Sequence, residues 1–531
     1  MADSIGIDIG STNIKVVLLD GDLAVRASAE RPLFSHQSGD VAEQDAGFLW
    51  EAVVDALRAL GGQAGAGGLG DVATIGLCGQ YSSIVPVDEA GRPLAPLRLY
   101  LDRRGTDHCL ELLGADGAFE AWIERHPIPP VGGGLALGHL LAFQLDHPEL
   151  HERTATYLEP VDYVTTRLTG RATATQGSMF AGQLVDNRTL GVTAYDPDLL
   201  RRSGVDPSRL PPLVRPDEVV GTVLAEVAAA TGLPTTARVR AGMTDSQAAA
   251  LATGARSSGS VGIAIGTTSV VLATTPTLGL DLDHEVLSMP GVMADRYLVW
   301  AENGLAGRAV ETVLSRLVHP DDALGDHGVA DPFQGFESAL AASPPGAGGV
   351  VFLPWLAGSL APQADPSVRG GFLGVSLETN RVDLVRAAVE GVAHNLRWLL
   401  GPVESFTGTT FDEAVLVGGA ARSPGWTQVL ADVLERPVRT VVDPGRAGAR
   451  AVAAWSVDPD SASTASASTD AREPASSASS ASSGSRGPSP ASRWDRHHEP
   501  DPTASEVHAA THQRFVDAFA ALRPLRLGDP T

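Results

Sequence analysis

Asp245 has the residue type and surroundings of a general base in this 531-residue chain. It ends a predicted strand beside Gly242 and precedes an alanine-rich helical pattern. An aspartate in such a place is most often the N-cap of the helix. It could instead accept the proton of an attacking hydroxyl, which phosphoryl transfer requires. These residues alone leave both interpretations open.

The turn Gly10-Ser11-Thr12-Asn13 could cradle a phosphate group. Its glycine allows close approach to the backbone, and successive N–H groups and hydroxyls supply donors. Asp8, two residues before the glycine, could hold Mg²⁺ directly or through water. Lys15 is the only lysine among the 39 lysine and arginine residues and could place a compact charge near a phosphate. The alternative is an ordinary hairpin with a solvent-facing lysine.

Two later glycine turns have similar properties. Gly266-Thr267-Thr268 joins the predicted strands 260–265 and 270–273, and repeats the pattern of the first turn. Two such hairpins on two halves of a protein would form a clamp for a polyphosphate. Gly418-Gly419 follows a predicted buried strand, and its missing side chains would let a flat ligand approach the backbone. Ser423 could cap the next helix and touch a ligand, although this segment also fits a plain strand–helix connection.

The elements that must position these residues indicate an α/β fold. Residues 5–9 and 14–20 form a predicted hairpin, followed by an amphipathic helix over 46–60 and a buried strand over 72–77. Such alternation favours a sheet covered by helices. The hairpin pattern returns at 260–273, which indicates two related halves with a boundary near 254–259.

Composition narrows the class of protein. Hydrophobic residues make up 43% and charged residues 19%, which is typical of soluble globular domains. The net charge of -24 argues against nucleic acid and anionic membranes as partners. Cys78 and Cys109 are too few for a disulfide framework and lack metal-ligand spacing. We find no signal-peptide pattern and no apolar stretch near the ~20 residues of a membrane helix. A cytoplasmic protein is expected.

The serine- and alanine-rich segment 456–504 differs from the rest of the chain. It contains almost no large apolar residues, so burial cannot offset the cost of ordering it, and we expect a disordered insertion. Helical periodicity returns over 508–522. The predicted organisation is an N-terminal lobe over 1–254, a C-terminal lobe over 255–455, the insertion over 456–504, and a helix within 505–531 that docks on the C-terminal lobe.

Taken together and in this order, the motifs resemble the FGGY carbohydrate kinases, in particular their xylulokinase-like branch. The resemblance runs from about residue 5 to 455 and resumes over 499–525. The most specific stretch is 418–432, which is similar to the C-terminal signature and adenosine site of the family. Further matches lie at 352–358, 369–374 and 390–393.

The resemblance implies a two-lobed actin-like ATPase (ribonuclease H-like) fold, with ATP and the sugar in the interdomain cleft. Asp245 falls on the catalytic aspartate, which would deprotonate a hydroxyl that attacks the γ-phosphate of Mg·ATP. Asp8 would be the second catalytic residue and the metal ligand. The implied ATP-binding residues are Gly10, Ser11, Thr12, Lys15, Gly266, Thr267, Thr268, Gly307, Glu311, Gly419 and Ser423.

Residues 76–83 and 99–104 are similar to the sugar-contacting segments of xylulokinases. The implied substrate-binding residues are Gln80, Tyr81, Ser82, Asp102, Asp245 and Ser246. Tyr81-Ser82 stands where xylulokinases usually have Met-His, Ser246 where they usually have asparagine, and Tyr100 where they have tryptophan. These departures affect the sugar pocket and leave the ATP motifs intact.

The expected function is therefore phosphorylation of a small sugar, with D-xylulose or a similar ketose as the first candidate. Another sugar or a polyol is an alternative substrate, because a site that hydrogen-bonds particular hydroxyls discriminates strongly. A non-catalytic regulator that binds sugar or nucleotide with the same fold is the alternative from a different class. The sequence sets no oligomeric state, and a homodimer stays open.

Overall fold

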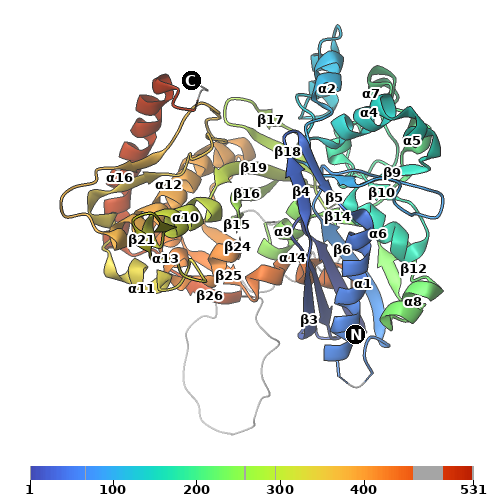
Figure 1. Cartoon of the computed structure of the whole chain (residues 1–531), viewed down its shortest axis with the longest axis horizontal. Coiled ribbons are helices and arrows are strands. Elements are labelled where there is room, and N and C mark those ends of the chain that lie inside the picture. The colour runs from blue at the N-terminus through green and yellow to red at the C-terminus, as the bar shows by residue number, and fades with distance from the viewer. Residues whose placement is uncertain (1, 66, 256–258, 294, 458–493, 529–531) are drawn as a thin grey trace, which may run out of the picture. The chain divides into compact units, whose positions relative to one another are not determined.

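The computed structural model describes the chain except residues 1, 66, 256–258, 294, 458–493 and 529–531. The described residues form two compact units (Figure 1). Three stretches contribute to each unit, whereas the sequence analysis drew one boundary at 254–255. Unit 1 draws on Met1–Leu251, Met289–Arg296 and Gly448–Ser492, and unit 2 on Ala252–Ser288, Tyr297–Ala447 and Arg493–Thr531.

Unit 1 is built on a seven-stranded sheet. Its order is β12 (Val219–Thr222), β13 (Arg238–Arg240), β6 (Val72–Gly79), β1 (Asp3–Ile9), β2 (Asn13–Leu19) and β3 (Val25–Pro32), and β14 (Met243–Thr244) also pairs with β6. β1 and β2 form the predicted antiparallel hairpin, and β1 pairs with β6 in parallel. The apolar residues of these strands are almost all buried, as expected for a sheet covered on both faces.

Helices cover this sheet. α1 (Ala46–Gln63) starts where the Asp45 carboxylate accepts from the N–H groups of Gly47 and Phe48, and it buries its apolar face. α6 (Pro160–Thr169) and α8 (Ala225–Thr231) belong to the same core. α14 (Ala447–Val457) packs against β1 and β6 at two glycines, Gly6 and Gly76. A Cβ at Gly6 would lie 1.7 Å from the Ala449 carbonyl oxygen, so only glycine allows this approach.

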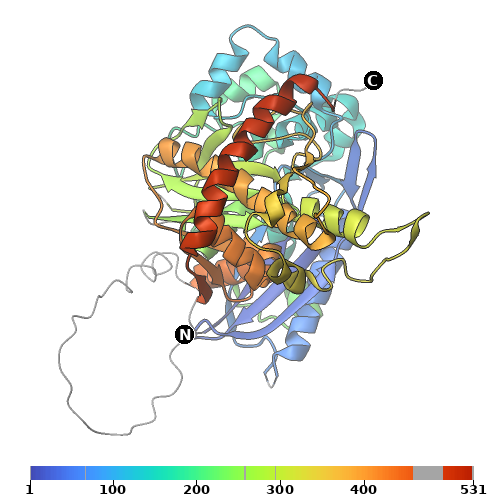
Figure 2. The same ribbon diagram turned by 90° about the vertical axis from the view of Figure 1, so that its left-hand side faces the viewer.

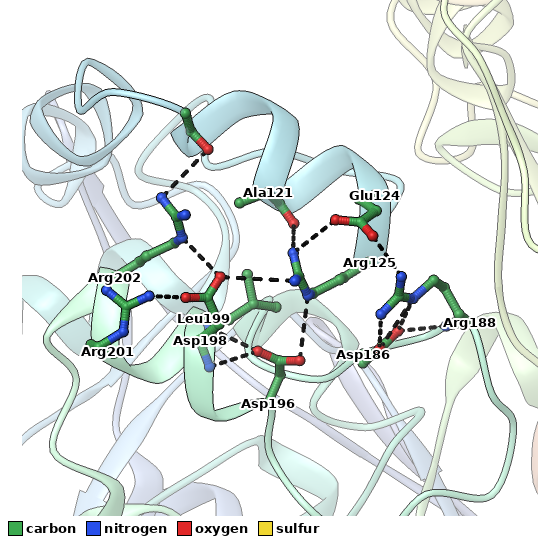
Figure 3. Close-up of polar contacts among 11 residues, drawn as sticks. Ala121, Glu124, Arg125, Asp186, Arg188, Asp196, Asp198, Leu199, Arg201 and Arg202 are labelled. Atoms are coloured by element: carbon green, nitrogen blue, oxygen red, sulfur yellow. Dashed lines mark hydrogen bonds and ion pairs between the residues drawn. The ribbon is translucent and has the colours of Figure 1, made fainter.

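A second, mostly helical layer of unit 1 surrounds the buried Trp122. Figure 3 shows arginine–carboxylate pairs on its surface, where Arg125 Nε lies 3.5 Å from Asp196 Oδ2 and Arg188 Nη1 lies 2.7 Å from Glu124 Oε1. The exposed pair of Arg188 and Glu124 is of a kind that contributes ~0–1 kcal/mol, whereas Arg125 and Asp196 are partly buried. The helices of this layer are α2 (Thr106–Leu113), α3 (Ala118–Arg125), α4 (Ala136–Asp146), α5 (Pro148–Arg153) and α7 (Pro197–Ser203). Short strands of unit 1 are β4 (Ser35–Ser38), β5 (Val41–Gln44), β7 (Val85–Val87), β8 (Leu97–Arg98), β9 (Thr156–Leu158), β10 (Ala174–Thr175) and β11 (Leu213–Val214).

Unit 2 contains an eight-stranded sheet. Its order is β17 (Leu280–Asp281), β18 (Val286–Pro290), β19 (Tyr297–Leu305), β16 (Thr268–Thr275), β15 (Ser260–Ile265), β24 (Glu413–Gly418), β25 (Val438–Val441) and β26 (Trp494–His498). β15 and β16 form the second predicted hairpin, and β15 pairs with β24 in parallel. Shorter strands are β20 (Asp321–Asp322), β21 (Gly325–Asp326), β22 (Val351–Leu353) and β23 (Gly371–Leu373).

The helices of unit 2 include α12, which starts with a capping box between Asn380 and Asp383. The C-terminal helix α16 packs against α12 and α13 (Figure 2). Its Phe515 is fully buried, with its ring centroid 5.1 Å from that of Trp355. The bounds are α10 (Gly307–Val313), α11 (Phe336–Ala342), α12 (Arg381–Thr407), α13 (Pro424–Leu434) and α16 (Pro502–Leu522), and α9 (Asp245–Thr253) lies at the boundary of the two units.

The end of the predicted insertion 456–504 needs a correction. Residues 458–493 lie outside the described part, but Trp494–His498 forms β26, which pairs antiparallel with β25, and α16 begins at Pro502. Backbone hydrogen bonds to β25 and a bond from Arg496 Nη2 to the Ala421 carbonyl oxygen (2.9 Å) hold this strand. Within the described residues, no helix is both long and apolar enough to span a membrane.

Candidate functional site

The parallel strands of unit 1 bring three predicted site residues of that unit to one edge of the sheet. Asp8 on β1 lies opposite Cys78 on β6, and Gly79 at the end of β6 lies opposite Thr244 on β14. Asp8, Gln80 and Asp245 therefore stand at or just beyond the carboxyl ends of three neighbouring strands. In open α/β sheets this edge is where ligands bind.

Asp245 does not serve as the cap of α9. The Thr244 hydroxyl accepts from the Gln247 N–H (3.2 Å), and Gln247 Oε1 accepts from the Thr244 N–H (3.0 Å), which is a capping box. Among the described residues, the Asp245 carboxylate accepts from its neighbour Ser246, through the N–H at 2.7 Å and the hydroxyl at 3.4 Å. The alternative interpretation of Asp245, as the N-cap of α9, is therefore wrong, because Thr244 occupies the N-cap position.

The electrostatics of Asp245 suit a proton acceptor. The protein atoms around Asp245 remove part of its hydration, and this desolvation, together with the negative charge of Asp8, raises the pKa of Asp245 to about 7. The residue nevertheless keeps an exposed surface. Burial likewise raises the pKa of Asp8, against the opposing charge of Lys15, its cross-strand neighbour. A base with a pKa near the working pH combines the ionised state with useful proton affinity.

The predicted phosphate turn, residues 10–13, is fixed by one internal hydrogen bond and one from Leu33, and it leaves donors free. Gly10 N–H donates to the Asn13 carbonyl (3.0 Å), and Leu33 N–H donates to the Thr12 carbonyl (2.7 Å). Within the described part of the chain, the backbone N–H groups of Ser11 and Thr12 donate to no protein acceptor. Such adjacent unpaired amides fit an anion, as the sequence analysis expected for a phosphate.

Gln44, at the end of β5, joins the phosphate turn to residues 80–83, called the sugar loop after their predicted role. Its Nε2 donates to the Ser11 carbonyl (2.5 Å) and to Ser35 Oγ (3.0 Å), and its Oε1 accepts from Gln80 Nε2 (3.1 Å). Sequence reasoning missed this residue, because nothing in the pattern of a four-residue strand distinguishes a buried glutamine.

Glu159 fixes the shape of the sugar loop. Its carboxylate accepts from the N–H groups of Ser82 (3.1 Å) and Ser83 (3.0 Å), and burial raises its pKa well above the usual value. Ser82 has a φ of 62°, a left-handed conformation that needs such support in a non-glycine residue. The Ser82 hydroxyl donates to the Gly134 carbonyl (3.2 Å). Sequence reasoning missed Glu159 too, since an acid before Pro160 is typical of any helix start.

Asp102 and Tyr81 are held largely by the protein. Asp102 is fully buried and accepts from the Ala42 N–H (3.0 Å) and from Arg104 Nε. Burial alone would raise the pKa of Asp102, but these hydrogen bonds, with the charge of Arg104, hold it below its usual value. Tyr81 packs against the Trp122 cluster. Gln80 differs from both, because its Oε1 is buried without a partner in the described part of the chain.

In unit 2, the second glycine turn lies beside the glycine pair. Ile265 pairs with Gly418, so the turn 266–268 and Gly419 leave the same edge of the sheet. The N–H of Gly307, at the start of α10, donates to the Gly266 carbonyl (3.0 Å), and a Cβ at Gly307 would lie only 2.2 Å from that oxygen.

Two further predicted positions of unit 2 have protein partners. Ser423 Oγ accepts from the Trp426 N–H (2.9 Å), which confirms the predicted cap of α13. Glu311 lies one turn along α10 and pairs with Arg308 (3.0 Å). Thr267 and Thr268 lie in the turn itself, and a side-chain hydrogen bond joins Thr268 to Glu302. The structure therefore gathers the turn, Gly307 and Gly419, with Ser423 and Glu311 further along their elements.

Asp8 is the carboxylate of unit 1 that could hold a divalent cation near the phosphate turn. No group of three or more histidine, cysteine, aspartate or glutamate residues in the described ranges could bind a metal ion by itself. Mg²⁺ commonly uses one or two carboxylates together with phosphate oxygens and waters. The single carboxylate of Asp8 and the unpaired amides of Ser11 and Thr12 fit a cation that arrives with a polyphosphate.

Comparisons with known proteins agree with this geometry. A model of the N-terminal domain of the FGGY family of carbohydrate kinases matches residues 4–252, and a model of its C-terminal domain matches residues 261–457. A xylulose kinase of Bacillus subtilis is 28% identical over 438 residues, covering 82% of this chain and 84% of that protein. A gluconokinase of the same organism is 25% identical over 451 residues, covering 82% and 83%. The crystal structure of xylulose kinase from Rhodospirillum rubrum matches with a TM-score of 0.79 and 27% identity over 99% of both chains, which confirms the predicted actin-like ATPase fold class.

Proposed function

This chain belongs to the FGGY family of carbohydrate kinases, and on that premise we propose that it phosphorylates a neutral sugar, with D-xylulose as the first candidate. It is a phosphotransferase with an alcohol group as acceptor. ATP as the phosphate donor, Mg²⁺ as its counter-ion and the identity of the sugar are parts of the proposal. Xylulose kinases among its relatives support the choice of sugar.

The observation that carries the proposal is the position of the Asp245 carboxylate together with its raised pKa. Its carboxylate lies outside the helix cap, at the same sheet edge as Gln80 and Asp8, and has a pKa of about 7. A carboxylate that only stabilised α9 would need none of these properties. A general base for an alcohol needs all of them, because it must be free, positioned and ionised near neutral pH.

Each group of residues has a part in the proposed reaction. Asp245 takes the proton of the sugar hydroxyl as that oxygen attacks phosphorus. The N–H groups of Ser11 and Thr12 bind phosphate oxygens, and Asp8 holds the cation. When bound, Mg·ATP supplies the γ-phosphoryl group. Gly266, Thr267, Thr268, Gly307, Glu311, Gly419 and Ser423 of unit 2 are the proposed nucleotide contacts, with Lys15 of unit 1 as an additional charge.

A neutral sugar suits this site better than a sugar acid. Asp8 and Asp245 both place carboxyl groups at the sheet edge, and the charge of Asp8 already raises the pKa of Asp245. An anionic substrate would add a further like charge, which is unfavourable at short distance. Among the proposed sugar contacts, Gln80 supplies an unpaired acceptor that suits a hydroxyl.

The experiment is an ADP-release assay on the purified full-length chain with Mg·ATP and a panel of acceptors. The panel contains D-xylulose, other ketoses, aldoses, polyols and gluconate, and mass spectrometry identifies the phosphorylated product. We expect turnover with a ketose and little with gluconate. Binding of ATP and a sugar without any turnover would support the regulator and contradict the kinase.

A further inference from the structure

The side-chain amide of Gln44 has every hydrogen-bonding group engaged. It is 4% exposed, and its Nε2 donates to Ser11 and Ser35 while its Oε1 accepts from Gln80. Gln44 therefore connects the carbonyl of the phosphate turn with the side chain of the sugar loop through two consecutive hydrogen bonds.

The chemistry of Ser11 sets the direction of these bonds. A backbone carbonyl oxygen can only accept, so the atom of Gln44 that faces it must be Nε2. Oε1 of Gln44 then faces Gln80, which has to donate through its own Nε2. The amide orientation of both glutamines follows from one carbonyl group, which settles a choice that is otherwise ambiguous for such side chains.

These bonds leave the side-chain oxygen of Gln80, a hydrogen-bond acceptor, without a donor among the described residues. Gln80 is 5% exposed, and its Oε1 is buried without a partner in the described part of the chain. The backbone of Gln80 cannot turn to relieve this, because its N–H donates to the Ile9 carbonyl (2.8 Å) at the end of β1. A buried amide oxygen left unpaired is unfavourable, and a ligand O–H that donates to it removes the penalty.

We propose that Gln44 is a positioning residue that holds Gln80 with its Oε1 presented to a hydroxyl of the sugar. The proposal rests on the sugar kinase function proposed above and adds a residue that determines specificity. The site requires a hydrogen-bond donor on the substrate at this point. An analogue that lacks that hydroxyl leaves Gln80 Oε1 unpaired and is rejected.

The test compares steady-state constants of the full-length enzyme, three single leucine variants and one double variant. Gln44→Leu puts an uncharged side chain, shorter by one bond, in place of the amide and removes all three hydrogen bonds. We expect its KM for the sugar to rise about tenfold to a hundredfold, the loss typical of an unpaired buried polar group. The KM for ATP should change less than about threefold, because Gln44 contacts the carbonyl of the phosphate turn and not its free N–H groups. Gln37→Leu, on the exposed neighbouring strand β4, is the matched control and should leave both constants unchanged.

A double variant separates positioning from general damage. If Gln44 acts through Gln80, Gln44→Leu combined with Gln80→Leu should be no worse than Gln80→Leu alone. Multiplied losses in the double variant, or an unchanged sugar KM in Gln44→Leu, would overturn the inference while the kinase function stood. Absence of turnover in the wild-type enzyme with every sugar would overturn both. If Gln44→Leu melts at a lower temperature, Gln44→Met, which has the length of glutamine and likewise lacks the amide, takes its place with the same expected results.

Discussion

Thr244 and Gln247 hydrogen-bond to each other reciprocally, at 3.2 and 3.0 Å, and thereby complete the start of α9 without Asp245, one of the two residues between them. The start of the helix and the proposed proton transfer therefore depend on different side chains. A substitution at one should therefore leave the other role intact, and the two roles can be measured separately.

Replacing Asp245 with asparagine should abolish sugar phosphorylation and leave the fold intact. The amide cannot accept the proton of the attacking hydroxyl, and a positioned base contributes typically ~10²–10⁴-fold to the rate. We expect the melting temperature and the affinity for ATP to stay close to those of the wild type. Calorimetric titration with ATP and an ADP-release assay measure the two effects. Retained turnover in this variant would refute the role given to Asp245.

Removing the capping box should have the opposite effect to Asp245→Asn: it should lower the stability of the protein and leave proton transfer intact. Thr244→Ala should lower the free energy of unfolding by about 1 kcal/mol, the usual cost of losing an N-cap. Gln247→Ala should lower the free energy of unfolding further, because Gln247 Nε2 also donates to the Pro290 carbonyl (2.8 Å). Denaturant titrations of both variants and of the double variant would show losses that do not add, since the partners share one unit. Additive losses would mean that the two residues act independently.

The activity should depend on the ionisation of Asp245. Its pKa is raised to about 7, so the fraction of ionised base falls about tenfold for each pH unit below that value. The kcat/KM for the sugar should therefore rise from pH 5.5 to about 7 and level off above. The ATP concentration is kept saturating, so that the profile reports the base. A flat profile over this range would contradict Asp245 as the titrating group.

Local patterns predicted the two hairpins and the cap of α13. These features depend on residues a few positions apart, such as the glycine turns at 10–13 and 266–268. The positioning residues could not be predicted in this way. Gln44 bonds to Ser11, which lies 33 positions away, and Glu159 bonds to Ser82, which lies 77 positions away. Such contacts exist only after the strands have come together.

The strand β26 illustrates the same limit for the fold. Its five residues, Trp494 to His498, contain one apolar side chain, so no hydrophobic alternation marks them as a strand. Their extended conformation comes from pairing with β25, whose residues stand more than fifty positions earlier. Composition alone therefore extended the predicted insertion to 504, beyond the start of α16.

Acid should destabilise the protein through a group of three histidines, of which His394 and His508 are buried and His512 is partly buried. His394 on α12 lies with its ring centroid 5.6 Å from those of His508 and His512 on α16, and both its ring nitrogens are buried without a partner among the described residues. Burial and then the charges of these neighbours hold the pKa of His394 well below the usual value. The unfolded chain takes up the proton near pH 6.5, whereas the folded chain does not, so stability falls as the pH drops below that point.

The measurement compares unfolding free energies of wild type and His394→Gln between pH 6 and 4.5. The wild type should lose up to about 1.4 kcal/mol more per pH unit than the variant, the contribution of one proton. His36→Gln, at an exposed position of β4, should keep the slope of the wild type. Equal slopes for wild type and His394→Gln would show that His394 is protonated in the folded chain.

Docking of the C-terminal helix should depend on Phe515. This side chain is fully buried, with its ring 5.1 Å from Trp355 and 6.4 Å from Trp398 between centroids, so truncation leaves a cavity that the two large rings cannot fill without moving. Phe515→Ala should cost about 3–5 kcal/mol of unfolding free energy. Phe34→Ala makes the same chemical change at a side chain that is 70% exposed, and should cost less than about 0.5 kcal/mol. Chemical denaturation of the two variants measures both costs. Similar costs would mean that α16 is not stabilised by this aromatic contact, whereas the expected difference would make α16 an integral part of unit 2.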